Sequence, residues 1–215
     1  MKFENTEVFN FEGALRGMRN PLESWEKSDS EYKWSSMIFE IGKNDLELMQ
    51  KLIKAGSEHR KFMRQIFVSV DITAPLFWWK EFDTYKVGTV ANSTSTMHKL
   101  ASTPITPECF ERDDYKDINF GNEKDPMFIT EIWEMLLINL EKLRIKYNDT
   151  QNKCYWKELI RLLPESWLQK RTVTMNYENV LNIIKQRKNH KLSEWSRSFI
   201  DWAKQLPYAN ELLFL

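Results

Sequence analysis

A run of small polar residues, GTVANSTST from Gly88 to Thr96, is the stretch of this sequence best suited to hold an anion. Its hydroxyls and backbone N–H groups can hydrogen-bond a phosphate, and Lys86 or Lys99 can add positive charge. The same composition is also typical of a solvated turn. The residues alone leave both interpretations open.

Isolated ionisable residues elsewhere offer further chemistry. His59 and His98 have side chains that can exchange a proton near neutral pH, although a lone histidine is more often structural. Arg187 follows an apolar helical stripe, where an arginine at the end of a helix is favoured by the helix dipole. Hydrolase, phosphate-loop, zinc-protease and dinucleotide-binding motifs are all missing. The sequence therefore identifies no catalytic residue and no metal site.

The elements that must position these residues follow from hydrophobic periodicity. The aromatic segment from Ala74 to Phe82 is expected to be a buried helix, with Trp78 and Trp79 in the core or in a subunit interface. Further helices are expected over residues 127–147, 151–163 and 177–188, and strands over 32–42, 67–72 and 171–176. The pattern predicts a helix-rich α+β fold with a small antiparallel or mixed sheet. We expect a single domain over residues 1–215, with a polar loop or insertion near 103–126.

Composition limits the classes of function. Lys plus Arg and Asp plus Glu both number 31, so the formal net charge is zero and nucleic acid is not an expected partner. No apolar run approaches the length needed to cross a membrane. The first residues, MKFENTEVFNFEG, lack the apolar core of a signal peptide. These features predict a cytoplasmic protein without a bound metal.

Three short blocks of the sequence resemble the flavin-dependent thymidylate synthases, the ThyX family, in the family's own order. The apolar helix entry of that family is matched by Ala74-Pro75-Leu76-Phe77, and its arginine-rich signature falls on the residues from Thr84 to Met97. Upstream, His59 falls on the first histidine of the family's G-H-x-S-P-x-E-H block. Downstream, the family's last block is matched by Leu163-Pro164, Asn176, Asn182 and Arg187.

The resemblance implies a function and a set of ligand-binding residues. It implies binding of FAD and of a pyrimidine-nucleotide-like small molecule, transfer of a one-carbon unit to that nucleotide, and a homotetramer with ligand sites between subunits. Carried onto this chain, the ligand-binding positions are His59, Glu81, Lys86, Thr89, Asn92, Thr94, Thr96, Asn176 and Arg187.

The chain departs from the family at the signature itself. The R-H-R that helps to hold flavin and nucleotide is replaced by Thr84-Tyr85-Lys86, and the serine and arginine that help to hold the dUMP phosphate are replaced by Thr94 and Thr96. Lysine lacks the planar fork of an arginine. Three functions therefore stay open. The chain is a flavin-dependent one-carbon transferase, a catalytically inactive nucleotide-binding protein, or a purely structural homo-oligomer.

Overall fold

The chain folds into two compact units that share long strands. The computed structural model describes all residues except Ser36 and Met37. The first unit comprises Met1, Thr73–Asp83 and Ser93–Arg171, and we call it the α5 unit. The second comprises Lys2–Ile72, Thr84–Asn92 and Thr172–Leu215, and we call it the α7 unit. The chain crosses from one unit to the other within strands β4 and β6.

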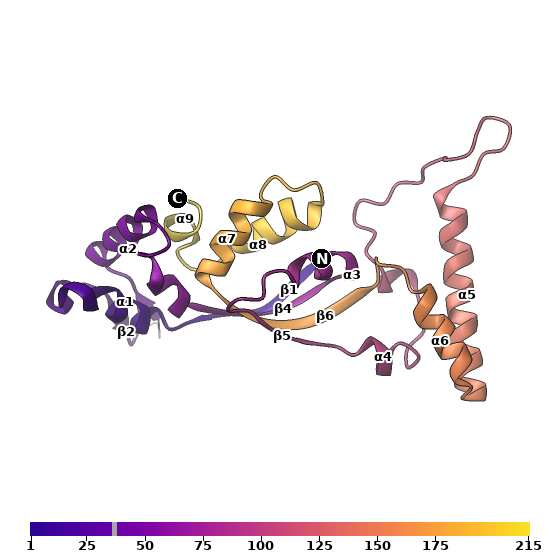
Figure 1. The fold of residues 1–215 in the computed structure, drawn as a ribbon, viewed down its shortest axis with the longest axis horizontal. Helices are drawn as coiled ribbons and strands as arrows, with labels where there is room; N and C mark the ends of the chain where they lie inside the picture. The colour runs from indigo at the N-terminus through magenta and orange to yellow at the C-terminus, as the bar shows by residue number, and fades with distance from the viewer. Residues whose placement is uncertain (36–37) are drawn as a thin grey trace. The chain divides into compact units, whose positions relative to one another are not determined.

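A four-stranded sheet has the strand order β1-β4-β6-β5. The strands are β1 (Lys2–Phe9), β4 (Phe67–Pro75), β5 (Val90–Ser93) and β6 (Leu168–Asn176) (Figure 1). Burial alternates along β4, and the β-branched residues Val68, Val70 and Ile72 all lie on its buried face. The strands expected near 67–72 and 171–176 are thus confirmed, as is the helix-rich α+β class.

The helix expected from Ala74 begins two residues later. Ala74 and Pro75 are the last residues of β4, and helix α3 spans Leu76–Phe82. Pro75 has an extended backbone at the N-cap position, where its missing N–H does not matter. Trp78 and Trp79 are fully buried, as expected, while Leu76 and Phe77 are half-buried.

The α5 unit is built around a pair of long helices. Its helices are α3, α4 (Thr96–Lys99), the 3-10 turn η4 (Pro107–Cys109), α5 (Ile129–Thr150) and α6 (Lys153–Leu162). Helices α5 and α6 run side by side (Figure 1). Their contact encloses a core of buried apolar residues, namely Leu100, Ile105, Phe110, Leu140 and Leu159. The expected helices at 127–147 and 151–163 are therefore present, with ends shifted by a few residues.

The α7 unit contains most of the shorter helices. These are α1 (Phe11–Arg19), η1 (Asn20–Leu22), η2 (Trp25–Lys27), α2 (Lys43–Ala55), η3 (Lys61–Gln65), α7 (Tyr177–Arg187), the π-helix η5 (Glu194–Phe199), α8 (Ile200–Ala203) and α9 (Ala209–Leu212). Within the described residues, no helix is long and apolar enough to cross a membrane.

One strand was expected over residues 32–42, and the structure has two short ones there. Strand β2 (Glu31–Lys33) pairs antiparallel with β3 (Ile38–Glu40), with Tyr32 opposite Phe39. The weak alternation of the sequence did not separate these two strands. Residues 36–37 of the expected strand lie outside the described residues.

A buried ion pair ties this hairpin region to α1 and α2. The Nε of Arg19 donates to Asp45 Oδ1 over 2.6 Å, and both side chains are buried. The second oxygen of Asp45 accepts hydrogen bonds from the hydroxyls of Ser28 and Ser30, each over 2.6 Å. Burial raises the pKa of the Asp45 carboxyl, but these hydroxyls and Arg19 outweigh burial, so the net pKa lies below its usual value.

Candidate functional site

The segment from Thr84 to Asn92, which we call the loop and which contains the first half of the polar run Gly88–Thr96, is fixed onto helix α7. The side-chain amide of Asn179 donates to the carbonyl oxygen of Val87 over 2.7 Å. One residue before the end of the helix, Gln186 accepts a hydrogen bond from the hydroxyl of Tyr85 over 3.0 Å. These two contacts hold segments that are far apart in sequence, and they give the loop a defined position against the helix.

Gly88 lies where the loop comes closest to the start of α7. Its φ is +75°, in the left-handed region that favours glycine. A Cβ built on Gly88 would lie 2.8 Å from Asn176 Nδ2 and 3.1 Å from Asn179 Oδ1. A side chain at this position would therefore push against both asparagines.

Asn176 starts helix α7 and has a structural role there. Its side-chain oxygen accepts the backbone N–H of Asn179 over 3.0 Å, and the side-chain oxygen of Asn179 accepts the backbone N–H of Asn176 over 3.1 Å. This reciprocal capping box satisfies two helix-end donors. The resemblance suggested Asn176 as a ligand residue. Asn179, which supports both the cap and the loop, was missed, although the N-x-x-N spacing of the two asparagines is a usable signal.

Arg187 is held at the other end of α7 by aromatic side chains. Its Nε donates to the hydroxyl of Tyr85 over 2.8 Å, across 102 residues of sequence. The guanidinium lies 4.9 Å from the ring centroid of Trp195 and 5.7 Å from that of Tyr85, which are cation–π distances. Tyr85 thus receives a hydrogen bond from Arg187 and donates one to Gln186. Sequence reasoning named Arg187 but neither Trp195 nor this use of Tyr85.

The loop has further polar groups, one between these anchor points at Lys86 and two beyond them at Thr89 and Asn92. Lys86 is exposed, and so is Asn92 on strand β5. The hydroxyl of Thr89 is buried and has no hydrogen-bond partner among the described residues. A buried hydroxyl without a partner costs about 1–3 kcal/mol, so its presence needs an explanation.

Besides Arg187 at its end, helix α7 carries a charged residue, Glu178, on its first turn. The carboxylate of Glu178 is nearly buried and accepts hydrogen bonds from Arg60 Nε, over 3.0 Å, and from Arg64. Burial raises the pKa of the Glu178 carboxyl, but the two arginines outweigh burial, so the net pKa lies below its ordinary value. The ion pairs of Glu178 with Arg60 and Arg64 connect η3 and the residue before it to α7. They were not expected from the sequence, because the arginines and the glutamate are more than a hundred residues apart.

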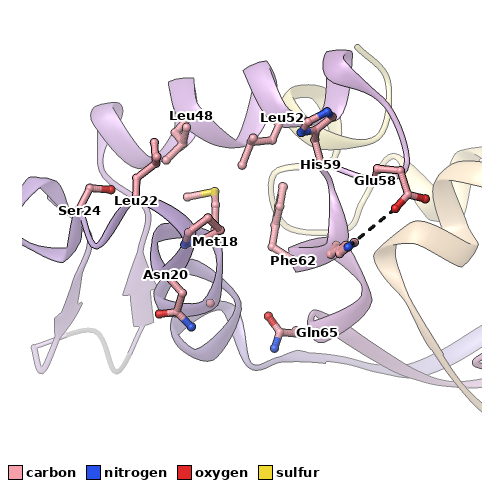
Figure 2. A pocket seen from close by; sticks show the side chains of 13 residues that line it. Met18, Asn20, Leu22, Ser24, Leu48, Leu52, Glu58, His59, Phe62 and Gln65 are labelled. Atoms are coloured by element: carbon pink, nitrogen blue, oxygen red, sulfur yellow. Dashed lines mark ion pairs between the residues drawn. The ribbon is translucent and has the colours of Figure 1, made fainter.

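His59 lies at a separate cavity of the α7 unit. The cavity has a volume of about 600 Å³ and is formed by α1, α2 and the turn before η3. Figure 2 shows Met18, Leu22, Leu48, Leu52 and Phe62 among its apolar side chains, with His59 exposed at one end. None of the loop or α7 residues described above lines it.

The other expected ligand positions belong to the α5 unit. Glu81 is half-buried on α3. The backbone N–H of Thr94 donates to the carbonyl oxygen of Lys170 over 2.9 Å, which continues the strand pairing there. Thr96 Oγ1 accepts a long hydrogen bond of 3.4 Å from Gln169. Of the nine expected residues, the structure thus gathers Lys86, Thr89, Asn176 and Arg187 around α7, and Asn92 ends the same loop segment. Among the described residues, no group of histidines, cysteines and carboxylates could hold a metal ion.

The chain has the fold of the flavin-dependent thymidylate synthases, which confirms for the fold the resemblance found in the sequence. Two crystal structures of ThyX from Helicobacter pylori illustrate the likeness. One, complexed with FAD and dUMP, has a TM-score of 0.69 at 19% sequence identity, with 100% of this chain and 98% of that chain covered. The other, with FAD and dUMP at 2.31 Å resolution, has a TM-score of 0.67 at 18% identity, covering 100% and 97%. No protein-family model matches the chain, and no curated protein matches its sequence.

Proposed function

We propose that this chain is a divergent ThyX-like protein that binds a pyrimidine-nucleotide-like ligand with the loop from Thr84 to Asn92. The observation that carries the proposal is the attachment of this loop to α7. Lys86 lies between two anchored residues of the loop, Tyr85, which is held by Arg187, and Val87, which is held by Asn179. Thr89 follows two residues after Val87. A preorganised loop binds its ligand without first losing conformational entropy.

The chemistry of the loop suits an anionic group. Lys86 is exposed and can offer its ammonium to a phosphate as a point charge. The partnerless hydroxyl of Thr89 can donate to the same group after a small shift of the loop. Arg187 acts through Tyr85, whose ring it holds against the end of α7. Glu81, Thr94, Thr96, Asn92 and His59 stay predictions from the sequence match.

FAD fits the loop less well than a single phosphate does. The pyrophosphate of FAD carries two negative charges, and Lys86 is the only cationic residue from Thr84 to Asn92. Where the family has its R-H-R, the middle residue here is Tyr85, and its hydroxyl is already bonded to Gln186 and Arg187. We therefore favour nucleotide binding without one-carbon transfer. The second candidate is a flavin-dependent one-carbon transferase, favoured by the full-length likeness to structures that hold FAD and dUMP.

Two measurements separate these functions. The absorbance spectrum of the purified chain, with mass spectrometry of released small molecules, identifies bound flavin or nucleotide. Calorimetric titration with dUMP, FAD and inorganic phosphate then ranks affinities. We expect dUMP to bind and Lys86→Gln to weaken that binding about tenfold or more, since a charged hydrogen bond contributes about 1.5–3 kcal/mol.

The matched control is Lys54→Gln, which removes an exposed lysine from the last turn of α2. It should leave the affinity for dUMP unchanged. Flavin absorbance bands in the purified protein would favour the transferase instead. Failure of both dUMP and FAD to bind would leave the structural homo-oligomer.

A further inference from the structure

The β2–β3 hairpin, η2 and helix α1 form the walls of a second cavity in the α7 unit, which we call the aromatic cavity. Its volume is about 480 Å³, a size typical of small-molecule sites. Three aromatic side chains line it, Trp25 from η2 and Tyr32 and Phe39 from the two strands of the hairpin. Leu15 of α1 adds a further apolar wall. None of the loop or α7 residues lines this cavity.

The three aromatic rings are placed by backbone pairing and by a hydrogen bond. Tyr32 and Phe39 lie directly opposite one another in the antiparallel register of the hairpin, so their side chains share one face. The Nε1 of Trp25 donates to Asn20 Oδ1 over 2.9 Å, which fixes the orientation of the indole. Trp25 nevertheless stays 49% exposed and Tyr32 38%. Large aromatic groups that stay exposed around a cavity are typical of a binding site.

The polar groups of the lining already use their hydrogen-bond donors within the protein. The hydroxyls of Ser28 and Ser30 both donate to Asp45 Oδ2, each over 2.6 Å. The three nitrogens of Arg19 donate to Asp45 and to two backbone carbonyl oxygens. Arg19 and Asp45 together carry no net charge. A bound anion would therefore gain little from these residues.

Exposed carboxylates outnumber exposed cations along the lining. Glu12 and Glu31 both line the cavity and are exposed, against one exposed cation, Arg16. Arg16 lies 4.0 Å from Glu12, and its side chain is 68% exposed, so solvent screens its charge. Lys33, on the same strand as Glu31, pairs with Glu40 of the opposite strand. The exposed charges of the lining thus favour a cation over an anion.

Aromatic faces beside carboxylates attract cations, and a methylated ammonium group is the form that such aromatic cages recognise. We propose that the aromatic cavity binds a small organic cation with a quaternary ammonium group, its methyl groups surrounded by the rings of Trp25, Tyr32 and Phe39. Glu12 and Glu31 supply the opposite charge. The proposal does not rest on nucleotide binding.

A pair of probes of equal shape tests whether charge is recognised. The first probe is choline, and the second is the neutral alcohol in which carbon replaces the charged nitrogen of choline. In calorimetric titration of the full chain, choline should bind at least about fivefold more tightly than the neutral alcohol, because only the cation is attracted by ring faces and carboxylates. A trimethyl-lysine amide serves as a third probe. Whichever ammonium probe binds more tightly shows whether the group comes from a choline-like molecule or from a modified side chain.

Removal of one ring tests the place of binding. Trp25→Leu keeps an apolar side chain but removes the ring face, and it should weaken choline binding about tenfold or more. The matched control is Trp156→Leu on α6. The indole of Trp156 also donates a hydrogen bond, to the carbonyl oxygen of Met97 over 3.2 Å, but it lies in the α5 unit. This control should bind choline like the wild type.

Removal of single charges tests the sign of the ligand. Glu31→Gln should weaken choline binding about threefold or more, whereas Arg16→Gln should strengthen it about twofold or more. Glu123→Gln removes an exposed carboxylate from the polar segment of the α5 unit, and it should leave the affinity unchanged. Circular dichroism checks that each variant is folded. If Trp25→Leu fails to fold, Phe39→Leu replaces it, since it removes another ring of the same cavity.

Three results would overturn the proposal. The first is that no ammonium probe binds at millimolar concentration. The second is that choline and the neutral alcohol bind equally well, which would make the cavity merely apolar. The third is that the charge variants shift the affinity in the opposite directions, or that the ring variant binds choline like the wild type.

Discussion

The close approach of Gly88 to Asn176 gives a quantitative test of the loop–helix contact. Replacing Gly88 by alanine adds a Cβ that would lie 2.8 Å from the side-chain nitrogen of Asn176. The new residue must also keep a φ of +75°. The left-handed conformation costs an alanine about 1–2 kcal/mol, and roughly 0.4–1 kcal/mol of this is offset by the stiffer unfolded chain.

The steric contribution comes from the cap of α7. Moving the Asn176 side chain breaks the capping box with Asn179, and loss of an N-cap costs about 0.5–2 kcal/mol. The two contributions sum to about 0.5–3.5 kcal/mol for Gly88→Ala. For a chain of this size, each kcal/mol lowers Tm by about 2–4 °C.

A double-mutant cycle separates strain from steric contact. Asn176→Ser keeps an oxygen that can cap the helix but removes the amide nitrogen that faces Gly88. In this background Gly88→Ala should lose the contact with Asn176 and retain the strain and the looser contact with Asn179 Oδ1. Urea unfolding followed by tryptophan fluorescence should give a coupling energy of about 0.5–2 kcal/mol, beyond the additivity error of about 0.3–0.5 kcal/mol.

Gly56 provides the matched control for this cycle. It also has a positive φ, +108°, but nothing lies within 4 Å of a Cβ built on it. Gly56→Ala should therefore destabilise the chain by the same amount with and without Asn176→Ser. If Gly88→Ala is also additive with Asn176→Ser, the loop does not rest on the helix cap and our reasoning about the site is wrong.

Three further predictions concern charge and activity. Asp45→Asn should lower the free energy of unfolding by about 3–5 kcal/mol in urea unfolding, because it leaves the buried Arg19 without its ion-pair partner; a loss below about 1 kcal/mol would refute this role. The folded-state pKa of Glu178 is depressed, so its ion pairs with Arg60 and Arg64 stabilise the chain above the ordinary carboxyl pKa of 4.5, and this stability should be lost as pH falls below that value. Glu178→Gln should flatten that pH dependence of the unfolding free energy, and an unchanged slope would contradict it. The chain should also fail to rescue growth of a thymidine-requiring strain that lacks its own thymidylate synthase, and growth without thymidine would disprove the expected loss of ordinary thymidylate synthesis.

Local sequence patterns determined the elements of this protein and the outline of its fold. The β-branched run of β4 and the helical spacing along α5 and α7 are periodic patterns that can each be recognised within a single segment. Burial of Trp78 and Trp79 followed from the cost of exposing large aromatic surfaces. Three short motifs in the right order were enough to indicate the ThyX fold.

The partners of individual side chains were decided only by the tertiary structure. The sequence named Arg187, but its contacts with Tyr85 and Trp195 depend on how a distant loop and helix pack. On α5, periodicity predicted the helix, whereas only the structure shows that the face around Leu140 is covered and the face around Met135 is exposed. Periodicity is a property of one segment, so it shows that a face is apolar. What covers that face depends on contacts between segments, and these are fixed only when the chain has folded.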